Sequence, residues 1–312
     1  MTLDPGAEAM MQFVADAGLD TGPELPIAER RARMHAIATD PRIKKHPVHS
    51  VEEHNIPTAT THLPVRVYRP SDAAGLPMLA WFHGGAWIAG DLDTHDQLCR
   101  QLCDAVGCVV MAVDYRLAPE TKFPGAANDC VGAYDWATRH AAEVGADPTN
   151  LAIGGDSAGG NLTAVVAVLA REKEMQAPKL QVLVYPVVDY EFESPSMIDN
   201  AKGFFLETEN LKWSFEQYAR TPDDFNDRRL SPLRAKSLAG LPRAVVISAE
   251  YDPLRDQDEA YGARLQQEGV ATQIVRAPGL IHGFFGLQAF MPPAQEAWDT
   301  TVNALREAFG LN

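Results

Sequence analysis

The sequence predicts an α/β protein whose central sheet is mostly parallel and is flanked by helices on both faces. Two observations predict this fold class. Short apolar runs rich in β-branched residues alternate with longer stretches of helical periodicity, and such alternation joins parallel strands through crossover helices. Apolar residues make up 46% of the 312-residue chain, which suffices for a large buried core.

The predicted strands are short apolar runs bounded by turn residues. They cover Val65–Tyr68, Met78–Phe82, Cys108–Val113, Leu151–Gly154, Gln181–Tyr185, Ala244–Ser248 and Thr272–Arg276. A further run, His49–Ile56, is expected to add an antiparallel strand at the start of the sheet.

Helical periodicity fills the segments between these strands. The predicted helices there cover Thr94–Val106, Gly125–His140, Ala158–Glu174, Leu254–Glu268 and Ala294–Phe309. Two regions show helical patterns without any strand. They are residues 1–45, with Ala7–Ala17 and Ile27–Thr39, and residues 188–230, with Leu211–Arg220. Because helical insertions commonly act as lids, we predict a helical cap made from 1–45 and 188–230 over a core made from 46–187 and 231–312.

The charge balance limits the classes of partner. A formal net charge of -15 disfavours binding to nucleic acid or to an anionic membrane. The chain contains no run of about 18 apolar residues that would form a transmembrane helix. Its first residues, Met1–Glu8, lack the basic and apolar segments of a signal peptide. We therefore expect a cytoplasmic protein that binds neither nucleic acid nor membrane.

The chain has four cysteines, Cys99, Cys103, Cys108 and Cys130. Cys99 and Cys103 lie one helical turn apart and His95 precedes them by another turn, so a metal-binding stripe is one interpretation. A second ligand pair at zinc spacing is missing nearby, and the segment has the pattern of an ordinary packed helix. Buried, reduced thiols and no metal are the favoured interpretation.

The most informative segment reads Gly155-Asp-Ser157-Ala-Gly159, between an apolar strand and a helical run. G-x-S-x-G in this strand–turn–helix context is typical of a nucleophile elbow, where the turn is so tight that glycines must flank the serine. The serine hydroxyl then lies at a helix N-terminus, which favours developing negative charge. A phosphate-binding loop is excluded because Asn161 stands where its lysine is required.

A serine nucleophile needs a positioned imidazole and a carboxylate that orients it. With a nucleophile elbow the chain order is serine, acid, histidine, and His282 alone among the nine histidines follows Ser157. Four carboxylates after the strand Ala244–Ser248 compete for the acidic role: Glu250, Asp252, Asp256 and Asp258. Asp252 is favoured because Pro253 sets it in a turn, although a helix N-cap is a second interpretation of the same residue.

The segment His83-Gly84-Gly85-Ala86 follows a strand and offers backbone N–H groups to a ligand oxygen. Such donors stabilise a tetrahedral oxyanion. We predict that Gly84, Gly85 and Ala158 form an oxyanion hole and that His83 orients this loop. The alternative is a plain glycine turn.

Taken together, these motifs resemble the hormone-sensitive-lipase-like branch of α/β-hydrolases, called family IV among bacterial lipolytic enzymes. The matching segments are His83–Trp87, Asp114–Glu120, Gly155–Gly160, Asp252–Asp256 and His282–Phe284. The resemblance implies an α/β-hydrolase fold with a helical cap. It also implies carboxylesterase activity on small-molecule esters with short to medium acyl chains, no cofactor, and often a homodimer. One departure is Ala86, which replaces the third glycine of H-G-G-G. Within Asp114–Glu120, Arg116 and Glu120 are expected to tie loops together.

The aromatic and apolar residues beside the motifs are candidate pocket walls. They are Trp87, Phe204, Phe205, Leu206, Phe284 and Phe285, each of which is equally well explained as core. An amidase, lactonase or arylformamidase with the same triad is the first alternative, because one triad serves many leaving groups. A non-catalytic receptor on this fold is the second, and such receptors resemble enzymes whose histidine is replaced.

Overall fold

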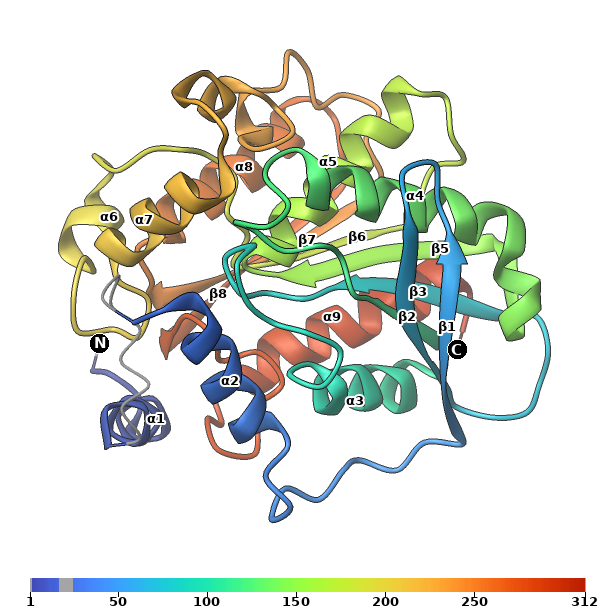
Figure 1. The fold of residues 1–312 in the computed structure, drawn as a ribbon, viewed down its shortest axis with the longest axis horizontal. Coiled ribbons are helices and arrows are strands. Elements are labelled where there is room, and N and C mark those ends of the chain that lie inside the picture. The colour runs from blue at the N-terminus through green and yellow to red at the C-terminus, as the bar shows by residue number, and fades with distance from the viewer. Residues whose placement is uncertain (1, 17–24, 312) are drawn as a thin grey trace.

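The computed structural model describes residues 2–16 and 25–311, and these form one eight-stranded sheet with helices on both faces (Figure 1). The strand order is β1-β2-β4-β3-β5-β6-β7-β8. The strands are β1 (Ser50–Pro57), β2 (His62–Arg69), β3 (Leu76–Phe82), β4 (Val109–Val113), β5 (Ala146–Asp156), β6 (Gln181–Val184), β7 (Ala244–Tyr251) and β8 (Thr272–Ile281). The predicted α/β class is confirmed.

The sheet is parallel from β4 across β3 to β8, and the antiparallel part lies at its β1 edge. The short connection after β1 makes β1 and β2 a hairpin, as the antiparallel pairing Ser50↔Arg69 shows. β2 is also antiparallel to β4, a second reversed pairing that the sequence pattern did not reveal.

The helices are α1 (Pro5–Asp16), α2 (Ile27–Ala38), α3 (Asp96–Val106), α4 (Gly125–His140), α5 (Ala158–Glu172), α6 (Pro195–Asp199), α7 (Thr208–Tyr218), α8 (Arg255–Gln267) and α9 (Ala294–Phe309). In Figure 1, α3 and α9 cover one face of the sheet, and α4, α5 and α8 cover the other. The predicted helix Ala7–Ala17 ends one residue outside the described part of the chain. No helix in the described residues is both long and apolar enough to cross a membrane.

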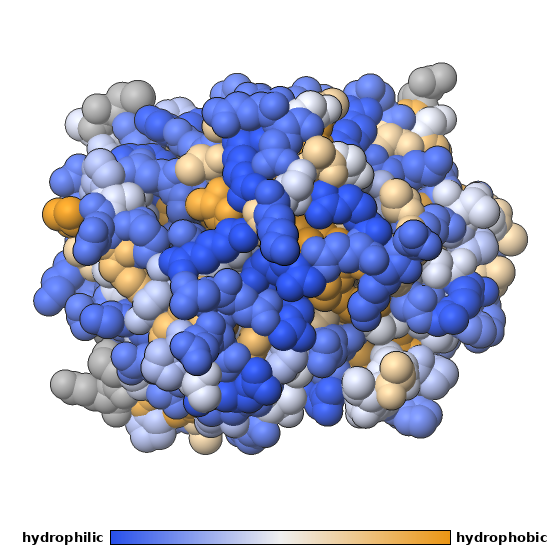
Figure 2. All heavy atoms as spheres, turned by 90° about the horizontal axis from the view of Figure 1, so that it is seen from above, coloured by the Kyte–Doolittle hydropathy of each residue, from blue (hydrophilic) through white to orange (hydrophobic). Residues whose placement is uncertain are grey.

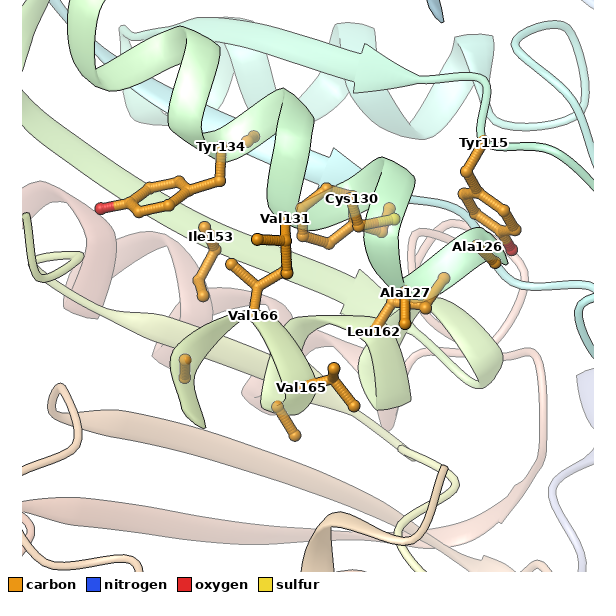
Figure 3. Packing of buried hydrophobic residues seen from close by; sticks show 14 of the residues in the cluster. Tyr115, Ala126, Ala127, Cys130, Val131, Tyr134, Ile153, Leu162, Val165 and Val166 are labelled. Atoms are coloured by element: carbon orange, nitrogen blue, oxygen red, sulfur yellow. The ribbon is translucent and has the colours of Figure 1, made fainter. Parts of the chain in front are cut away.

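Two hydrophobic cores separate on the two faces, because side chains alternate along each strand. On β3, Met78, Ala80 and Phe82 point into the core under α4 and α5, whereas Leu79 and Trp81 point into the core under α3 and α9. Figure 3 shows the first of these cores, where Cys130 and Val131 of α4 lie near Leu162 and Val166 of α5.

Helix α5 is buried along nearly its whole length, from Ala158 to Ala170. Its alanine- and glycine-rich sequence allows close approach to both the sheet and α4. Because α5 is buried in this way, its first residues are held rigidly at the end of β5.

The outer surface, seen from above the view of Figure 1, is mostly hydrophilic, with apolar side chains between the polar ones (Figure 2).

The segments predicted as a cap contribute α1, α2, α6 and α7, which lie together at one end of the sheet in Figure 1. Residues 17–24 of this region lie outside the described residues. The N-terminal segment is joined to the sheet by the Asp4 N–H, which donates to the carbonyl of Gly279 at 2.8 Å.

Strand β8 runs to Ile281, five residues beyond its predicted end at Arg276. The sequence Ala277-Pro278-Gly279 has the composition of a turn, and Gly279 does adopt a φ of 72°. The register with β7 shifts between Ala249 and Tyr251, so pairing resumes at Tyr251↔Ile281. This extension places His282 directly after the last residue of β8.

Candidate active site

Ser157 lies between the last residue of β5 and the first residue of α5, in a strained backbone conformation with φ 55° and ψ -119°. Only glycine fits two residues before it and two residues after it. A Cβ on Gly159 would lie 1.8 Å from the Phe82 carbonyl oxygen, and one on Gly155 would lie 2.4 Å from the Gly159 carbonyl oxygen. The Ser157 N–H donates to the Val184 carbonyl at 2.8 Å, which anchors the turn to β6.

His282 lies between Ser157 and Asp252. Its Nε2 is 2.9 Å from Ser157 Oγ, and its Nδ1 is 2.7 Å from Asp252 Oδ2. Asp252 is fully buried, and its Oδ1 accepts the Leu254 N–H at 2.9 Å. The three side chains come from the ends of β5, β7 and β8, where the sequence motifs predict them. They form one continuous hydrogen-bonded chain.

The other three candidate carboxylates make different contacts. Glu250 accepts the Gly279 N–H at 2.7 Å, and Asp256 accepts the Ser196 N–H at 2.8 Å. Asp258 is buried on α8. The bond from Leu254 to Asp252 Oδ1 fixes the turn into α8, so Asp252 orients the backbone there as well as contacting His282.

The loop after β3 is held by His83. Burial and the neighbouring His95 lower the pKa of His83 to about 4, so its ring is neutral at pH 7. Its Nδ1 lies 2.8 Å from the carbonyl oxygen of Gly84, and its ring stacks on Tyr115 at 4.2 Å. The Tyr115 hydroxyl donates to the His83 carbonyl at 2.7 Å.

The loop directs the Gly84 N–H away from the role that the sequence predicts for it. This N–H points at His95 Nε2, 3.2 Å away, and a Cβ on Gly84 would meet Asp156 Oδ2 at 2.3 Å. The next two N–H groups, of Gly85 and Ala86, have no hydrogen-bond acceptor among the described residues. We therefore replace Gly84 with Ala86 as a candidate oxyanion donor and keep Gly85 and Ala158.

Ser157 and His282 open into a cavity of about 910 Å³ that also contacts Gly85 and Ala86. The described lining is largely apolar and comes from both predicted cap segments and from the core. Its apolar side chains include Met10, Phe13, Met34, Ile37, Leu98, Leu206, Leu287 and Met291. A ligand in this cavity would have access to Ser157 and would contact mostly apolar side chains.

The comparison with protein families assigns residues 79–286 to the alpha/beta hydrolase fold, and this range contains every motif of the site. The chain belongs to the α/β-hydrolase family. The carboxylic ester hydrolase LipN of Mycobacterium tuberculosis is 40% identical over 98% of this chain and 83% of its own length. The ethyl acetate hydrolase of Pseudomonas putida is 37% identical over 98% of this chain and 99% of its own length.

Solved structures resemble this α/β hydrolase throughout its length. An ester hydrolase from the metagenome of Lake Arreo, in complex with a derivative of bipyridine phosphonate, superposes with a TM-score of 0.92 at 37% identity. The match covers 99% of this chain and 100% of that one. The match thus includes both the predicted cap segments and the predicted core.

Three of the six predicted pocket residues line the cavity of this α/β hydrolase: Phe205, Leu206 and Phe285. The other three are not among its described lining residues. Trp87 is buried and stacks on Tyr218 at 4.7 Å. Phe284 is buried against Tyr185, and Phe204 stacks on Tyr251 at 5.1 Å. Proximity to a motif in sequence does not set the direction of a side chain: Trp87 and Phe284 are buried, and Phe204 packs partly buried against the core.

Two residues near the triad were not singled out as site residues by the motifs. Tyr185, at the end of β6, has a φ of 33°, lines the cavity and contacts the His282 ring at 4.4 Å. The sequence suggests His95 only as a metal ligand, whereas its Nε2 lies 3.2 Å from Asp156 Oδ2. Tyr185 could have been predicted as a site residue because it ends the predicted strand next to the one that carries the nucleophile.

The Asp114–Glu120 segment ties loops together in the α/β hydrolase through two of its charged residues, Arg116 and Glu120. Arg116 donates twice to the buried Asp129 of α4, at 2.8 and 2.6 Å. Glu120 accepts two hydrogen bonds from Arg31 of α2. The second contact joins the core to the predicted cap.

One group in the described residues has the spacing of a metal site: His35, Asp91 and Asp93, with ligand atoms within 4.8 Å of one another. Their polar atoms already bond locally, because His35 Nδ1 lies 3.0 Å from Asp91 Oδ2 and Asp91 Oδ1 accepts the Asp93 N–H. All four cysteines are buried free thiols. We assign no metal to either set.

Proposed function

We propose that this α/β hydrolase cleaves carboxylic esters of short to medium acyl chains through an acyl-enzyme on Ser157. The observation that carries the proposal is the unbroken hydrogen-bonded chain from Ser157 through His282 to Asp252, whose first two members line a largely apolar cavity. The reaction class follows from the family and its ester-hydrolysing members, so the chain is a serine carboxylesterase.

The first half of the reaction forms the acyl-enzyme. Ser157 Oγ attacks the ester carbonyl carbon while His282 Nε2 takes the hydroxyl proton, and Asp252 remains ionised and stabilises the imidazolium. When the tetrahedral intermediate collapses, the bond from carbon to the alcohol oxygen breaks. His282 then gives its proton to that oxygen, and the alcohol leaves.

The second half repeats these steps with water. His282 takes a proton from water as its oxygen attacks the acyl carbon, and Ser157 Oγ leaves with the proton that His282 returns. In both intermediates the negative oxygen accepts hydrogen bonds from the backbone N–H groups of Gly85, Ala86 and Ala158. Ala158 is the first residue of α5, so its N–H has no intrahelical acceptor.

The cavity supports the substrate class. Its volume of about 910 Å³ and its largely apolar lining accommodate an uncharged ester with a modest hydrocarbon portion. Residues 1–45 and 188–230 act as the cap in this proposal, because Met34 of α2 and Ser214 of α7 belong to the same lining as Ser157.

Ser157→Ala tests the proposal directly. We expect hydrolysis of p-nitrophenyl butyrate to be abolished while the thermal unfolding profile stays unchanged. Ser214→Ala is the matched control, since Ser214 lines the same cavity but its hydroxyl donates to the Asn210 carbonyl at 2.8 Å. Turnover that persists in Ser157→Ala would rule out Ser157 as the nucleophile.

A substrate panel separates ester hydrolysis from the amidase, lactonase and arylformamidase alternatives. We expect kcat/KM to be highest for p-nitrophenyl esters of short to medium acyl chains and lower for anilides and lactones. Rapid labelling of Ser157 by a fluorophosphonate is expected of an enzyme and not of a receptor. His282, which receptors of this type are expected to lack, is present and contacts Ser157.

The proposal places the enzyme in the cytoplasm, and the support is that Cys99, Cys103, Cys108 and Cys130 are all free thiols. Fractionation of cells that express the tagged chain tests whether the enzyme is in the cytoplasm. The homodimer implied by the family resemblance stays a prediction, which sedimentation of the purified protein tests.

A further inference from the structure

His95 lies between the two chain segments that carry the proposed oxyanion donors. Gly84 begins the loop that contains Gly85 and Ala86, and Asp156 immediately precedes Ser157 and Ala158. The Nε2 atom of His95 is 3.2 Å from the Gly84 nitrogen and 3.2 Å from Asp156 Oδ2. One ring atom therefore contacts both halves of the oxyanion hole.

The His95 ring is held in place from its other nitrogen. The Thr94 hydroxyl donates to the Asp91 carbonyl at 2.8 Å, which leaves Thr94 Oγ1 to act as an acceptor. His95 Nδ1 lies 3.0 Å from this oxygen, so Nδ1 carries the proton of that contact. His95 also occupies the N-cap position of α3, which fixes its backbone.

The two groups at Nε2 need opposite protonation states of that atom. The Gly84 N–H donates to a bare Nε2, whereas an ionised Asp156 accepts from a protonated one. Burial raises the pKa of Asp156, but His95, with smaller contributions from His83 and His282, brings it below its usual value. In either state Nε2 hydrogen-bonds one of the two segments, the Gly84 N–H when it is bare or Asp156 when it is protonated, and lies in contact with the other.

The segment of Gly84 packs tightly against the segment of Asp156. A Cβ on Gly84 would lie 2.3 Å from Asp156 Oδ2 and 3.1 Å from the Asp156 carbonyl oxygen. The side chains of His95 and Asp156 are only 14% and 11% exposed, so water competes little for their contact. A small change in this contact changes the separation of the Gly85 and Ala86 N–H groups from that of Ala158.

We propose that His95 is a positioning residue, which sets the distance between the loop donors and the Ala158 donor of the oxyanion hole by contacting Gly84 and Asp156 at once. The inference rests on the proposed esterase function and adds a second histidine, beside His282, on which the rate depends. His95 lines the cavity, but no hydrogen bond among the described residues joins it to Ser157 or His282. Its effect is expected only where negative charge develops on the carbonyl oxygen, which is in the transition state.

The test compares His95→Ala, His95→Gln and His95→Asn on p-nitrophenyl butyrate, with active sites counted by fluorophosphonate titration. We expect kcat of His95→Ala to fall at least about tenfold with KM changed less than about twofold. Glutamine reaches the Nε2 position and asparagine does not, so kcat of His95→Gln should exceed that of His95→Asn. Equal kcat values for these two folded variants would overturn the proposal.

The inhibition constant of a trifluoromethyl ketone is a second measurement, which a general loss of stability would not change. Ser157 Oγ adds to its carbonyl carbon, His282 takes the hydroxyl proton, and the adduct carries an oxyanion in the proposed hole. Its inhibition constant should rise in His95→Ala by the same factor as kcat/KM falls. An unchanged inhibition constant beside a lowered kcat would also overturn the proposal.

Two further variants are measured: Gly84→Ala as a second perturbation of the same contact and His140→Ala as the control. Gly84→Ala pushes the same two segments apart and should reproduce the loss in kcat. His140→Ala removes another histidine–carboxylate contact, with Glu143 at 2.9 Å on the surface, and should keep kcat. Wild-type protein that hydrolyses no ester refutes the proposed function and this inference together. Wild-type hydrolysis with an unaffected His95→Ala refutes the positioning role alone.

Discussion

The carboxylate of Glu120 accepts two hydrogen bonds from the guanidinium of Arg31, at 2.9 and 2.8 Å, and so joins the loop after β4 to helix α2. Arg31 also donates to the carbonyl oxygens of Ile88 and Ala118, at 2.7 and 2.8 Å. Ile88 follows the proposed oxyanion loop, and α2 carries cavity-lining residues such as Met34. One arginine therefore holds the cavity wall against the loop that faces Ser157.

The two partners should contribute unequally to this attachment. Glu120 is 64% exposed, so Glu120→Ala should cost less than about 1 kcal/mol of stability. Arg31→Ala also leaves two carbonyls without their charged donor, for which about 1.5–3 kcal/mol each is typical. We expect Arg31→Ala to raise KM for p-nitrophenyl hexanoate clearly more than Glu120→Ala does. Equal KM values in the two variants would show that the exposed ion pair, and not the carbonyl contacts, positions α2.

Asp252→Asn should abolish most activity without unfolding the chain. The Leu254 N–H holds the Oδ1 of residue 252, so an asparagine would turn its NH₂ group toward His282 Nδ1. That donor forces the proton of His282 onto Nε2, which then cannot accept the proton of Ser157. A fall in kcat of ~10⁴ is expected, measured with p-nitrophenyl butyrate. Asp256→Asn is the control, and a comparable loss there would reopen the choice of carboxylate.

Gly159→Ala should be far more harmful than alanine at an unconstrained glycine. The added methyl group would lie 1.8 Å from the Phe82 carbonyl oxygen, in rigid backbone that cannot yield. Gly203 has a φ of 83°, and a Cβ there would meet no described atom within 4 Å, so Gly203→Ala adds only backbone strain of about 1–3 kcal/mol. We expect the melting temperature and the yield of folded protein to fall more in Gly159→Ala. A smaller effect there than in Gly203→Ala would contradict the steric account of the elbow.

The positions of Ser157, Asp252 and His282 were predictable because each depends on a local rule. Glycines around a serine after a strand indicate an elbow, and strand ends of a parallel sheet meet at one edge. The direction of the Gly84 N–H was not predictable in this way. It depends on a loop in which Ala86 and Trp87 adopt φ values of 54° and 61°, and on His95, which no motif connects to it.

Only some of the predicted pocket residues line the cavity, because the direction of a side chain also depends on the folded loop. Phe285 lines the cavity and its neighbour Phe284 does not, because successive residues after β8 point in different directions. The α1 and α2 side chains in the lining come from segments with no motif at all. Their apolar positions indicate amphipathic helices but do not indicate which surface those helices cover.

Asp258 provides a test in which pH changes stability. It is fully buried on α8, and neither carboxylate oxygen has a hydrogen-bond partner among the described residues. Burial, followed by the negative charges of Asp252, Glu259 and Asp256, raises the pKa of Asp258 well above its usual value. The folded state therefore favours the neutral carboxyl, whereas the unfolded chain ionises at its ordinary pKa.

The sign of the effect follows from this difference. The stability that depends on neutral Asp258 is fully present below the unfolded pKa and is lost as pH rises through the raised folded pKa. Asp258→Asn keeps the size of the side chain and never ionises. The melting temperature of Asp258→Asn relative to wild type should therefore rise steadily from pH 4 to pH 8, while the same difference for the exposed Asp299→Asn stays flat. If the difference in melting temperature between Asp258→Asn and wild type does not change with pH, the Asp258 carboxyl has an unrecognised partner that stabilises its charge.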